Sequence, residues 1–499
     1  MASLEEIRDV RLAKLKILKD AGIDPYPAGS RRTHTVAAAL GDFEELAEKK
    51  EVVTLAGRVM SLRPQGALFF LHFTDGSGEN AGTKIQALLK KEGTEGFDLF
   101  GQTVDIGDFI EVTGPLFVTK RNERSIEGSS WRMLSKSLRP LPEKWHGLQD
   151  VDERFRRRYL DALMSDEVRA RFILRSKLVT EIRSILDKAG YLEVETPALQ
   201  PLYGGASAVP FTTHHEALDM DLYLRISDEL YLKRMLVAGF PKIYEIARDF
   251  RNEGIDATHN PEFTMLEFYE SFATAATQMD FVEKMFKALV KKLFKDGPAA
   301  GKMLTYQEQE INFAEKFTVV SYFDLFRRYA LIPHPETIGR EELVTIATQK
   351  GIKVEPGDTI PKILDNIYKK VARPKLIQPT FIVDYPADYL PLAKRQIADT
   401  TKVEAFQLVI AGLEFVKAFS ELNDPIDQKE RFVAQEKNKT GGEADAQRLD
   451  EDFIEALEYG APPAGGVGIG IDRLAMLFAN VTNIKEVIFF PTMRPRDSQ

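Results

Sequence analysis

Two short segments, residues 243–253 and 262–270, carry the residues best suited to chemistry, and a turn-prone loop joins them. Both segments alternate apolar with polar residues, and the loop contains Gly254, Asn260 and Pro261, so together they predict a β-hairpin. Period-two alternation collects polar and aromatic side chains on one side of each strand. These residues are Arg251, Glu253, Phe263, Glu267 and Tyr269.

Burying such a mixed set of side chains is costly unless each charge finds a partner. A face with an arginine, two carboxylates and two aromatic rings is therefore expected of a ligand platform. The alternative is a solvent-facing sheet surface held by ion pairs, which contribute little to stability.

A second segment that could form part of a functional site is the glycine-rich run at residues 466–470. Asp472, Arg473 and a helical stretch, 474–478, follow it. Alternate glycines allow the backbone to approach a ligand closely. The spacing is Gly-x-Gly-x-Gly and no parallel βαβ context surrounds it, so a dinucleotide fingerprint is not indicated. The alternative is a strand packed by glycine against a helix, with Arg473 in a salt bridge.

These patterns resemble the signature motifs of class II aminoacyl-tRNA synthetases, in the version carried by lysyl enzymes. Residues 250–270, FRNEGIDATHNPEFTMLEFYE, are similar to the second motif, and residues 466–473 to the third. A predicted helix at 166–188 followed by a strand at 191–196 resembles the first motif. The resemblance implies ATP-dependent activation of L-lysine to lysyl-adenylate and its transfer to the 3′-terminal adenosine of tRNA(Lys). It also implies a homodimer, because the first motif builds the dimer interface in that family.

The resemblance implies a role for each of several residues at the nucleotide end of the site. Arg251 would bind the α-phosphate of ATP and the substrate carboxylate. Glu253 and Phe263 would frame adenine, and His259 would lie near the terminal phosphates. Arg473 would lie over the adenine ring as a cation–π partner. Arg251 and Arg473, with Mg²⁺, would be the catalytic groups, since the reaction needs alignment and charge stabilisation rather than a protein nucleophile.

The amino-acid end of the site should match a long apolar stem that ends in an ammonium group, which needs carboxylates or hydroxyls as acceptors. Glu267, Tyr269 and Glu421 match the lysyl family positions that receive this group. Glu229 and Gly205 match the positions that receive the α-amino group. Carboxylates left unpaired by a neutral side chain would reject methionine or leucine.

Three positions depart from the lysyl pattern. Lys417 stands where asparagine is usual, so either its side chain points away or lysine binding differs locally. Gln407 replaces the first magnesium-binding glutamate, which leaves Glu414 and Glu421 as the predicted metal and ATP-site carboxylates. Strict alternation puts these two on opposite faces unless a bulge intervenes. Asp388 stands where a glutamate is common.

A small barrel is predicted before these motifs. A helix at 4–21 precedes five short alternating strands at 52–60, 68–73, 84–89, 109–116 and 125–133, a pattern that suits an OB-fold. The barrel resembles the anticodon-binding domain of lysyl, aspartyl and asparaginyl enzymes. Arg63 and Phe70 match positions that touch the anticodon, and the alternative for Phe70 is a core aromatic.

The fold class is therefore α+β, with an OB-fold barrel followed by a catalytic domain built on an antiparallel sheet flanked by helices. A Pro-containing linker, 138–143, puts the predicted domains at 1–145 and 146–499. The stretch from about residue 274 to 370 is predicted as a helical insertion in the second domain. The adjacent pair His214 and His215 is interpreted as structural, since neighbours on a strand point to opposite faces.

Composition narrows the alternatives. The chain has 499 residues, a net charge of −9 and no cysteine, which excludes disulfides, thiolate zinc sites and a cysteine nucleophile. Any RNA binding must use local basic patches. No apolar run approaches the length needed to cross a membrane, and the N-terminus lacks a secretory pattern, so we expect a cytoplasmic protein.

Three rival functions remain. Aspartyl and asparaginyl synthetases share the barrel and the motifs, but Glu267 and Glu421 would repel aspartate. A catalytically inactive paralogue that only binds RNA or partners would have no need for Arg251, Glu253 and Arg473. Related lysine ligases that act on a translation factor lack the barrel.

Overall fold

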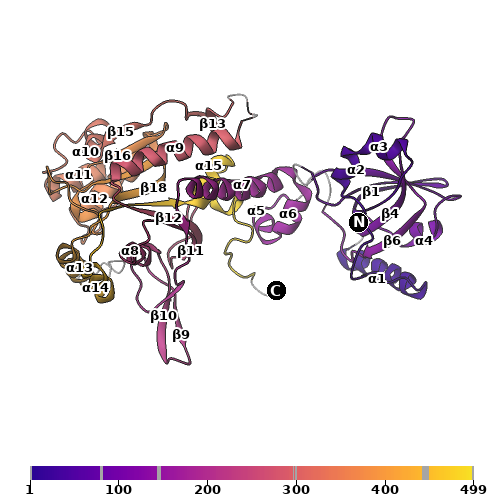
Figure 1. Cartoon of the computed structure of the whole chain (residues 1–499), viewed down its shortest axis with the longest axis horizontal. Helices are drawn as coiled ribbons and strands as arrows, with labels where there is room; N and C mark the ends of the chain where they lie inside the picture. Colours follow the sequence, from indigo (N-terminus) through magenta and orange to yellow (C-terminus); the bar gives the residue numbers. More distant parts are fainter. Residues whose placement is uncertain are drawn as a thin grey trace. The chain divides into compact units, whose positions relative to one another are not determined.

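The computed structural model describes residues 3–78, 82–142, 148–295, 297, 300–440 and 449–496. Contacts between Cα atoms divide the chain into two compact units, Met1–Ile173 and Leu174–Gln499, shown in Figure 1. The border falls within the long helix α7 (Asp166–Lys188). The domain boundary predicted between residues 145 and 146 lies outside the described residues and stays a prediction.

The first unit opens with helix α1 (Leu4–Asp20), which begins at Ser3 because the Ser3 hydroxyl accepts a hydrogen bond from the Glu6 N–H. Helices α2 (Val36–Gly41) and α3 (Phe43–Glu48) follow. The barrel contains β1 (Val52–Gln65), β2 (Leu68–Thr74), β3 (Ile85–Lys90), β4 (Phe109–Val118), β5 (Arg124–Gly128) and β6 (Ser130–Ser135). Strand β1 pairs with both β2 and β4, which closes the barrel and confirms the predicted OB-fold.

The last predicted strand of the barrel is divided at Ser129 into β5 and β6. The residues of β5 pair with β3 and with the end of β4, whereas the residues of β6 pair with the beginning of β4. The chain must therefore change neighbours at Ser129, which alternation alone does not reveal. A short helix, α4 (Phe97–Thr103), also lies between β3 and β4, and its Phe97 and Phe100 are buried in the barrel core.

Helices α5 (Val151–Arg156) and α6 (Arg158–Met164) complete the first unit up to α7. The second unit is organised around one eight-stranded sheet. Its strands, from one edge to the other, are β15 (Thr318–Ser321), β16 (Thr380–Val383), β17 (Ala405–Ile410), β18 (Leu413–Ser420), β19 (Ala464–Gly470), β12 (Glu262–Ser271), β11 (Lys242–Phe250) and β7 (Leu192–Glu193). Neighbouring strands are antiparallel except at the two edges. The α+β class with an antiparallel sheet is thus confirmed.

One face of this sheet is buried in the main hydrophobic core, and the other is largely open. On one face, Leu266 and Phe268 of β12 and Val467 of β19 are fully enclosed with α7, α9 (Ala275–Leu293) and α15 (Ile471–Phe478) in the main hydrophobic core. On the other face, helix α8 (Glu229–Val237) packs Leu232 and Leu236 against Ile243 and Tyr269. Because this second cluster is small, the rest of that face is open to a ligand.

The predicted helical insertion at 274–370 contains strands as well as helices. Its first helix, α9, belongs to the main core, and β13 (Met303–Tyr306) pairs with β14 (Gln309–Asn312) in a separate hairpin. Strand β15 extends the large sheet beside β16. The remaining elements are α10 (Tyr322–Leu325), η1 (Phe326–Ala330), α11 (Arg340–Gln349), α12 (Ile360–Ile367), η2 (Tyr368–Ala372) and η3 (Arg373–Lys375). These elements surround a second hydrophobic core.

A three-stranded sheet formed by β8 (Leu199–Gln200), β10 (Met220–Leu224) and β9 (Thr212–His215) projects from the second unit (Figure 1). His214 contacts Asp221 and His215 accepts from the Leu218 N–H, so both histidines take part in the β9–β10 hairpin itself. The other elements are η4 (Ala387–Tyr389), α13 (Pro425–Thr440), α14 (Glu451–Glu458) and η5 (Ile484–Glu486). No helix among the described residues has the length and apolar character that crossing a membrane requires.

Candidate functional site

The open face of the large sheet is set by strand register. Cα partners form a row across five strands: Glu245 of β11, Glu267 of β12, Gly468 of β19, Lys417 of β18 and Gln407 of β17. Directly paired residues point to the same face of a sheet. The row therefore puts side chains from distant parts of the chain over one surface.

A neighbouring row contains Tyr269, Gly466 and Phe419. An ideal Cβ on Gly466 would overlap both Oε1 of Glu421 and the ring of Tyr269. The glycine is thus required because two side chains of the site pass directly over its backbone.

A bulge in β18 places Glu414 on this face as well. Leu408 pairs with Val416, but the next residue, Val409, pairs with Glu414, so Phe415 is an extra residue in the strand. One extra residue reverses the alternation. Glu414 and Glu421, which strict alternation separates, consequently both line the same cavity.

The cavity over this face has a volume of about 330 Å³ and belongs entirely to the second unit. The structure brings together every residue predicted for the nucleotide and the amino-acid substrate. They are Gly205, Glu229, Arg251, Glu253, His259, Phe263, Glu267, Tyr269, Glu414, Glu421 and Arg473.

Two arginines supply positive charge to the cavity. Strand β11 ends at Phe250, earlier than predicted, and Arg251 lies just beyond, with its N–H donating to the Pro261 carbonyl at 2.9 Å. The Arg251 guanidinium donates to the Ile226 carbonyl and lies 5.0 Å from the centre of the Phe263 ring.

Arg473, at the first turn of α15, donates to the Glu414 carbonyl at 3.3 Å. Within the described residues, neither Arg251 nor Arg473 forms a salt bridge with a carboxylate, which differs from the predicted alternative for Arg473. Both charges are therefore available to an anionic ligand.

His259 is held between Arg473 and Asp256. Arg473 Nη2 lies 2.7 Å from His259 Nε2, and His259 Nδ1 lies 2.8 Å from Asp256 Oδ2. Because arginine can only donate, Nε2 must accept and the ring proton must be on Nδ1, donated to Asp256. Contacts with Asp256 and Arg473 therefore fix the orientation of the His259 ring.

Asp472 fixes the element that carries Arg473, a role that the sequence analysis missed. It is buried, its Oδ2 accepts from the Thr264 N–H at 2.6 Å, and it pairs with Arg175 of α7. These contacts attach the start of α15 to β12. The missed signal was a carboxylate at the first turn of a helix, where the helix dipole favours it.

Glu267 forms the centre of the acidic end of the cavity. It is 5% exposed, its Oε1 accepts from the Ser227 hydroxyl at 3.0 Å, and its Oε2 accepts from the Tyr269 hydroxyl at 2.7 Å. Gly205 has a φ of +84°, and a Cβ there would lie 2.9 Å from the Ser227 hydroxyl. Ser227 is a second residue that the sequence analysis left without a role.

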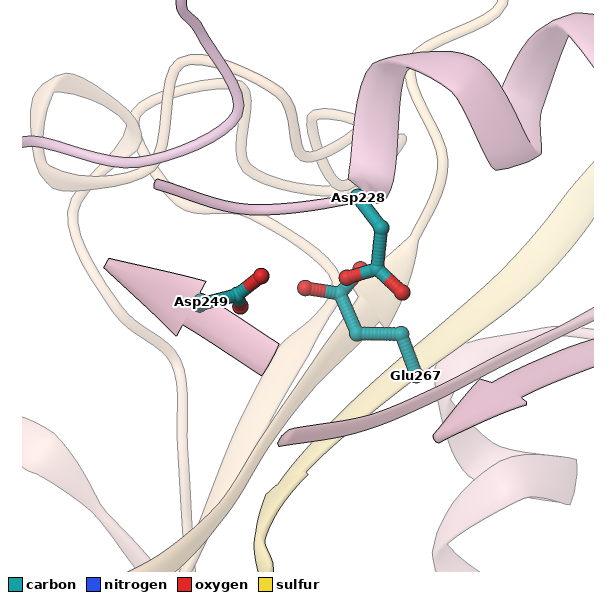
Figure 2. Close-up of side chains that lie close together, drawn as sticks. All are labelled: Asp228, Asp249 and Glu267. Atoms are coloured by element: carbon teal, nitrogen blue, oxygen red, sulfur yellow. The ribbon is translucent and has the colours of Figure 1, made fainter. Parts of the chain in front are cut away.

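Two further carboxyl groups lie beneath Glu267. Asp228, directly before α8, and Asp249 of β11 point toward it, and one oxygen of each of the three groups lies within 4.8 Å of the others (Figure 2). Burial, with the nearby charges of Glu229 and Asp249, raises the pKa of Glu267 to about 7. Burial also raises the pKa of Asp228 well above its usual range. The cluster thus retains protons near neutral pH.

Lys233 is the most consequential residue that the sequence analysis missed. Its Nζ lies 2.7 Å from Oε1 of Glu229 and pairs with Oε2 of Glu421, and the residue is 3% exposed. Burial raises the pKa of Glu421 to about 8, against the opposing charge of Lys233. The i,i+4 spacing of Glu229 and Lys233 was the available signal.

Lys417 and Gln407 also take defined positions. The side chain of Lys417 is exposed and lines the cavity, so it does not point away from the site. Gln407 accepts a hydrogen bond from the Tyr385 hydroxyl at 2.7 Å. The neutral amide of Gln407 therefore has a hydrogen-bond partner within the protein. Lys417 is a third cationic side chain, after Arg251 and Arg473, that lines the cavity.

The predicted metal carboxylates fit Mg²⁺ unequally. Glu414 lines the cavity beside Arg473 and forms no salt bridge among the described residues. Glu421 already pairs with the Lys233 ammonium, which competes with a metal ion for the same oxygen. Of the two, Glu414 has the carboxylate chemistry and the access that Mg²⁺ needs.

The predicted anticodon residues lie in the first unit. Arg63 and Phe70 are Cα partners on β1 and β2, and the Arg63 guanidinium lies 5.7 Å from the centre of the Phe70 ring. Leu71 and Phe73 are enclosed in the barrel core, whereas Phe70 is half-buried and lies outside it. An aromatic ring beside an exposed arginine is a suitable stacking surface for an unpaired base.

Comparisons with known proteins match both units. Residues 150–494 match the family model described as tRNA synthetases class II (D, K and N), and residues 53–134 match the OB-fold nucleic acid binding domain. The lysine–tRNA ligase of Pelotomaculum thermopropionicum is 47% identical over 99% of this chain and 96% of its own length. Those of Carboxydothermus hydrogenoformans and a Roseiflexus species are each 46% identical over 99% of this chain, and over 99% and 100% of their own lengths. The matches span the barrel, the large sheet and the cavity.

Proposed function

Because this chain belongs to the lysine–tRNA ligase family of class II tRNA synthetases, we propose that it joins L-lysine to tRNA(Lys) in two steps at the cavity described above. Lysine is first activated with ATP to lysyl-adenylate. A hydroxyl of the 3′-terminal adenosine of the tRNA then attacks the adenylate carbonyl, which forms the lysyl ester and releases AMP. The barrel holds the anticodon through Arg63 and Phe70.

One observation carries the proposal: a single cavity has arginines that pair with no carboxylate of the described chain and, over the same sheet face, buried carboxylates. The arginines suit a polyphosphate and a carboxylate. The carboxylates suit an ammonium group. A molecule with two ammonium groups, one carboxylate and an apolar stem, reacting with a nucleotide, satisfies both.

In the first step, the lysine carboxylate attacks the α-phosphorus of ATP in line, and pyrophosphate leaves. Arg251 binds the α-phosphate and the attacking carboxylate, which brings the two reactants together and offsets the negative charge of the transition state. Glu253 and Phe263 frame the adenine, and Arg473 lies over its ring. His259, oriented by Asp256, lies at the terminal phosphates.

At the other end, Glu267, Tyr269 and Glu421 receive the ε-ammonium group. Glu229 receives the α-amino group, next to the backbone of Gly205. Methionine and leucine would place an apolar end group against these buried carboxylates and supply no ammonium group to their remaining acceptor positions, so both are rejected. Aspartate would be repelled by Glu267 and Glu421, which argues against the aspartyl and asparaginyl activities of related enzymes.

Glu414, together with the phosphates of bound ATP, would hold Mg²⁺, and Glu421 is the second predicted ligand. The ion would neutralise phosphate charge and favour departure of pyrophosphate. Lys417 lines the cavity without a salt bridge among the described residues, so it can supply part of that positive charge itself.

The proposal includes a homodimer that acts in the cytoplasm, the assembly and compartment expected from the family resemblance. Leu192 of β7 and Leu199 of β8 are about half exposed, as residues of an unfilled interface would be. Light scattering should then report twice the chain mass of 56.3 kDa.

Lysine-dependent exchange of labelled pyrophosphate into ATP tests the function directly. The purified chain should catalyse exchange with lysine and not with aspartate, asparagine or methionine. Exchange with aspartate or asparagine would assign a related activity instead, and ATP binding without any exchange would indicate an inactive paralogue.

A further inference from the structure

Lys233 is buried behind the cavity, against two of its lining carboxylates, although neither the reaction nor the family resemblance gives it a role. Its ammonium group lies between Glu229 and Glu421, and it lies 5.4 Å from the centre of the Phe419 ring. Helix α8 supplies both Lys233 and Glu229, whereas Glu421 follows β18 and is fixed by its N–H, which donates to the Ala464 carbonyl at 2.8 Å. One ammonium group thus connects a helix to the sheet.

The two carboxylates that Lys233 connects have different tasks in the proposed function. Glu229 receives the α-amino group of the substrate, and Glu421 receives the ε-ammonium group. Glu421 lines the cavity, and its Oε1, which lies over Gly466, accepts no hydrogen bond within the described part of the chain. Lys233 therefore joins the acceptors for the two ends of one substrate.

We propose that Lys233 is a positioning residue that fixes the distance between the two ammonium subsites and thereby selects the length of the diamine. The inference rests on the proposed function and adds a specificity determinant to it. A rigid link matters because each subsite accepts any primary ammonium group. Only the spacing between subsites distinguishes lysine from ornithine, which is one methylene shorter.

Charge balance supports this role. Glu229, Glu267 and Glu421 all line the cavity, and the substrate brings two ammonium groups. Lys233 adds a buried positive charge between Glu229 and Glu421, which offsets part of the repulsion between these two carboxylates. Without Lys233, two buried carboxylates would repel each other and move apart.

Replacement of Lys233 by methionine tests the proposal, because methionine keeps the length of the stem and removes the charge. Arg234→Met is the matched control, since Arg234 is the next residue of α8 and pairs with Asp450, and neither residue lines the cavity. Pyrophosphate exchange would be measured for both variants with lysine and with ornithine, after thermal unfolding has shown that each is folded.

For Lys233→Met we expect the KM for lysine to rise about tenfold or more, with the KM for ATP changed by less than about threefold. The ratio of kcat/KM for lysine to that for ornithine should fall at least about fivefold, because one methylene is worth about tenfold or more only in a pocket of fixed length. Arg234→Met should leave this ratio unchanged.

An unchanged ratio in a folded Lys233→Met protein, or an equal loss for lysine and ornithine, would overturn the proposal. If wild-type protein fails to exchange with lysine, the proposed function itself is wrong. If Lys233→Met does not fold, a crystal structure of the wild-type protein with lysine decides. Lys233 Nζ should then remain within about 3.5 Å of both Glu229 and Glu421, and loss of either contact refutes the link.

Discussion

Arg251 illustrates how a single residue is prepared for catalysis. Its backbone continues the hairpin by one hydrogen bond beyond β11, and its guanidinium is oriented by the Ile226 carbonyl and the Phe263 ring. A positively charged group fixed before the reaction loses little free energy in reorganisation. The Arg251 guanidinium is thus already oriented to bind the α-phosphate.

Replacing Arg251 with alanine should reduce kcat/KM in lysine-dependent exchange at least about a hundredfold, because the transition state loses its fixed cation. Arg248→Ala is the matched control, since Arg248 lies on the same strand, is about half exposed and pairs only loosely with Glu262, at 3.4 Å. Near-normal exchange by Arg251→Ala would show that the hairpin does not bind the reacting groups.

Glu267 makes lysine binding dependent on pH. Its pKa in the empty site is raised to about 7, and an ammonium group favours the charged carboxylate, so binding below that pH must release a proton. Glu421 receives the same ammonium group and has a pKa raised to about 8, so the KM for lysine should rise as the pH falls through about 8 and about 7, while the KM for ATP changes little. A lysine KM that is constant between about pH 6 and 8 would contradict a carboxylate held partly protonated.

That the predicted site residues lie together at one cavity was largely predictable from their spacing and from the motif resemblance, but their partners within the protein were not. Glu267 and Tyr269 could be assigned to one strand face because alternation is local. Lys233 could not be linked to Glu421, because 188 residues separate them and only the folded sheet brings them together. Ser227 and Asp472 were missed for the same reason, since their partners Glu267 and Thr264 lie on other elements.

Among the elements, β19 has the least space for side chains on its cavity face. It lies between β12 and β18, and its glycines at 466 and 468 face the cavity. Gly466 is crossed by Glu421 and Tyr269, whereas a Cβ on Gly470 would meet only Arg473 Cβ, at an ordinary 4.0 Å. The strand therefore tolerates a methyl group at Gly470 and not at Gly466.

Gly466→Ala should raise the KM for lysine by about tenfold or more, because the new methyl group displaces Glu421 and Tyr269 from the ammonium subsite. Gly470→Ala, on the same strand and face, should change it by less than about threefold. Exchange kinetics with both proteins provide the measurement. Equal behaviour of the two variants would mean that the close approach at Gly466 has no functional importance.

Regular elements with strong periodicity were predicted well, and irregular ones were not. Helix α7 has the predicted bounds, 166–188, because a long apolar stripe ends at a glycine turn. The bulge at Phe415 and the change of neighbours at Ser129 depend on which strands lie alongside, which no local pattern records. Strands β13, β14 and β15 are only four residues long, too short for alternation to separate them from loops.

At the scale of the whole molecule, the two units divide the reaction between them. The cavity belongs to the second unit, and the proposed anticodon surface belongs to the first. Activation of lysine should therefore be insensitive to changes in the barrel. Charging of tRNA should depend on both units.

Phe70→Ala should raise the KM for tRNA about tenfold, since stacking of one base on an aromatic ring is worth about 1–3 kcal/mol, and should leave pyrophosphate exchange within about twofold. His72→Ala serves as the control, because His72 is on the same face of β2 but is hydrogen-bonded to Ser61 and Glu123. Loss of exchange in Phe70→Ala would show that the ring is needed for folding rather than for RNA.

The central position of β19 also has a consequence for how the protein is made. Strands β12 and β18 leave the ribosome long before residues 464–470, the strand that separates and pairs them, and until then their facing edges lack a partner. A nascent chain at that stage exposes hydrogen-bonding edges that invite association with other chains. Chains truncated before residue 464 should consequently aggregate more readily than the longer chain that includes β19.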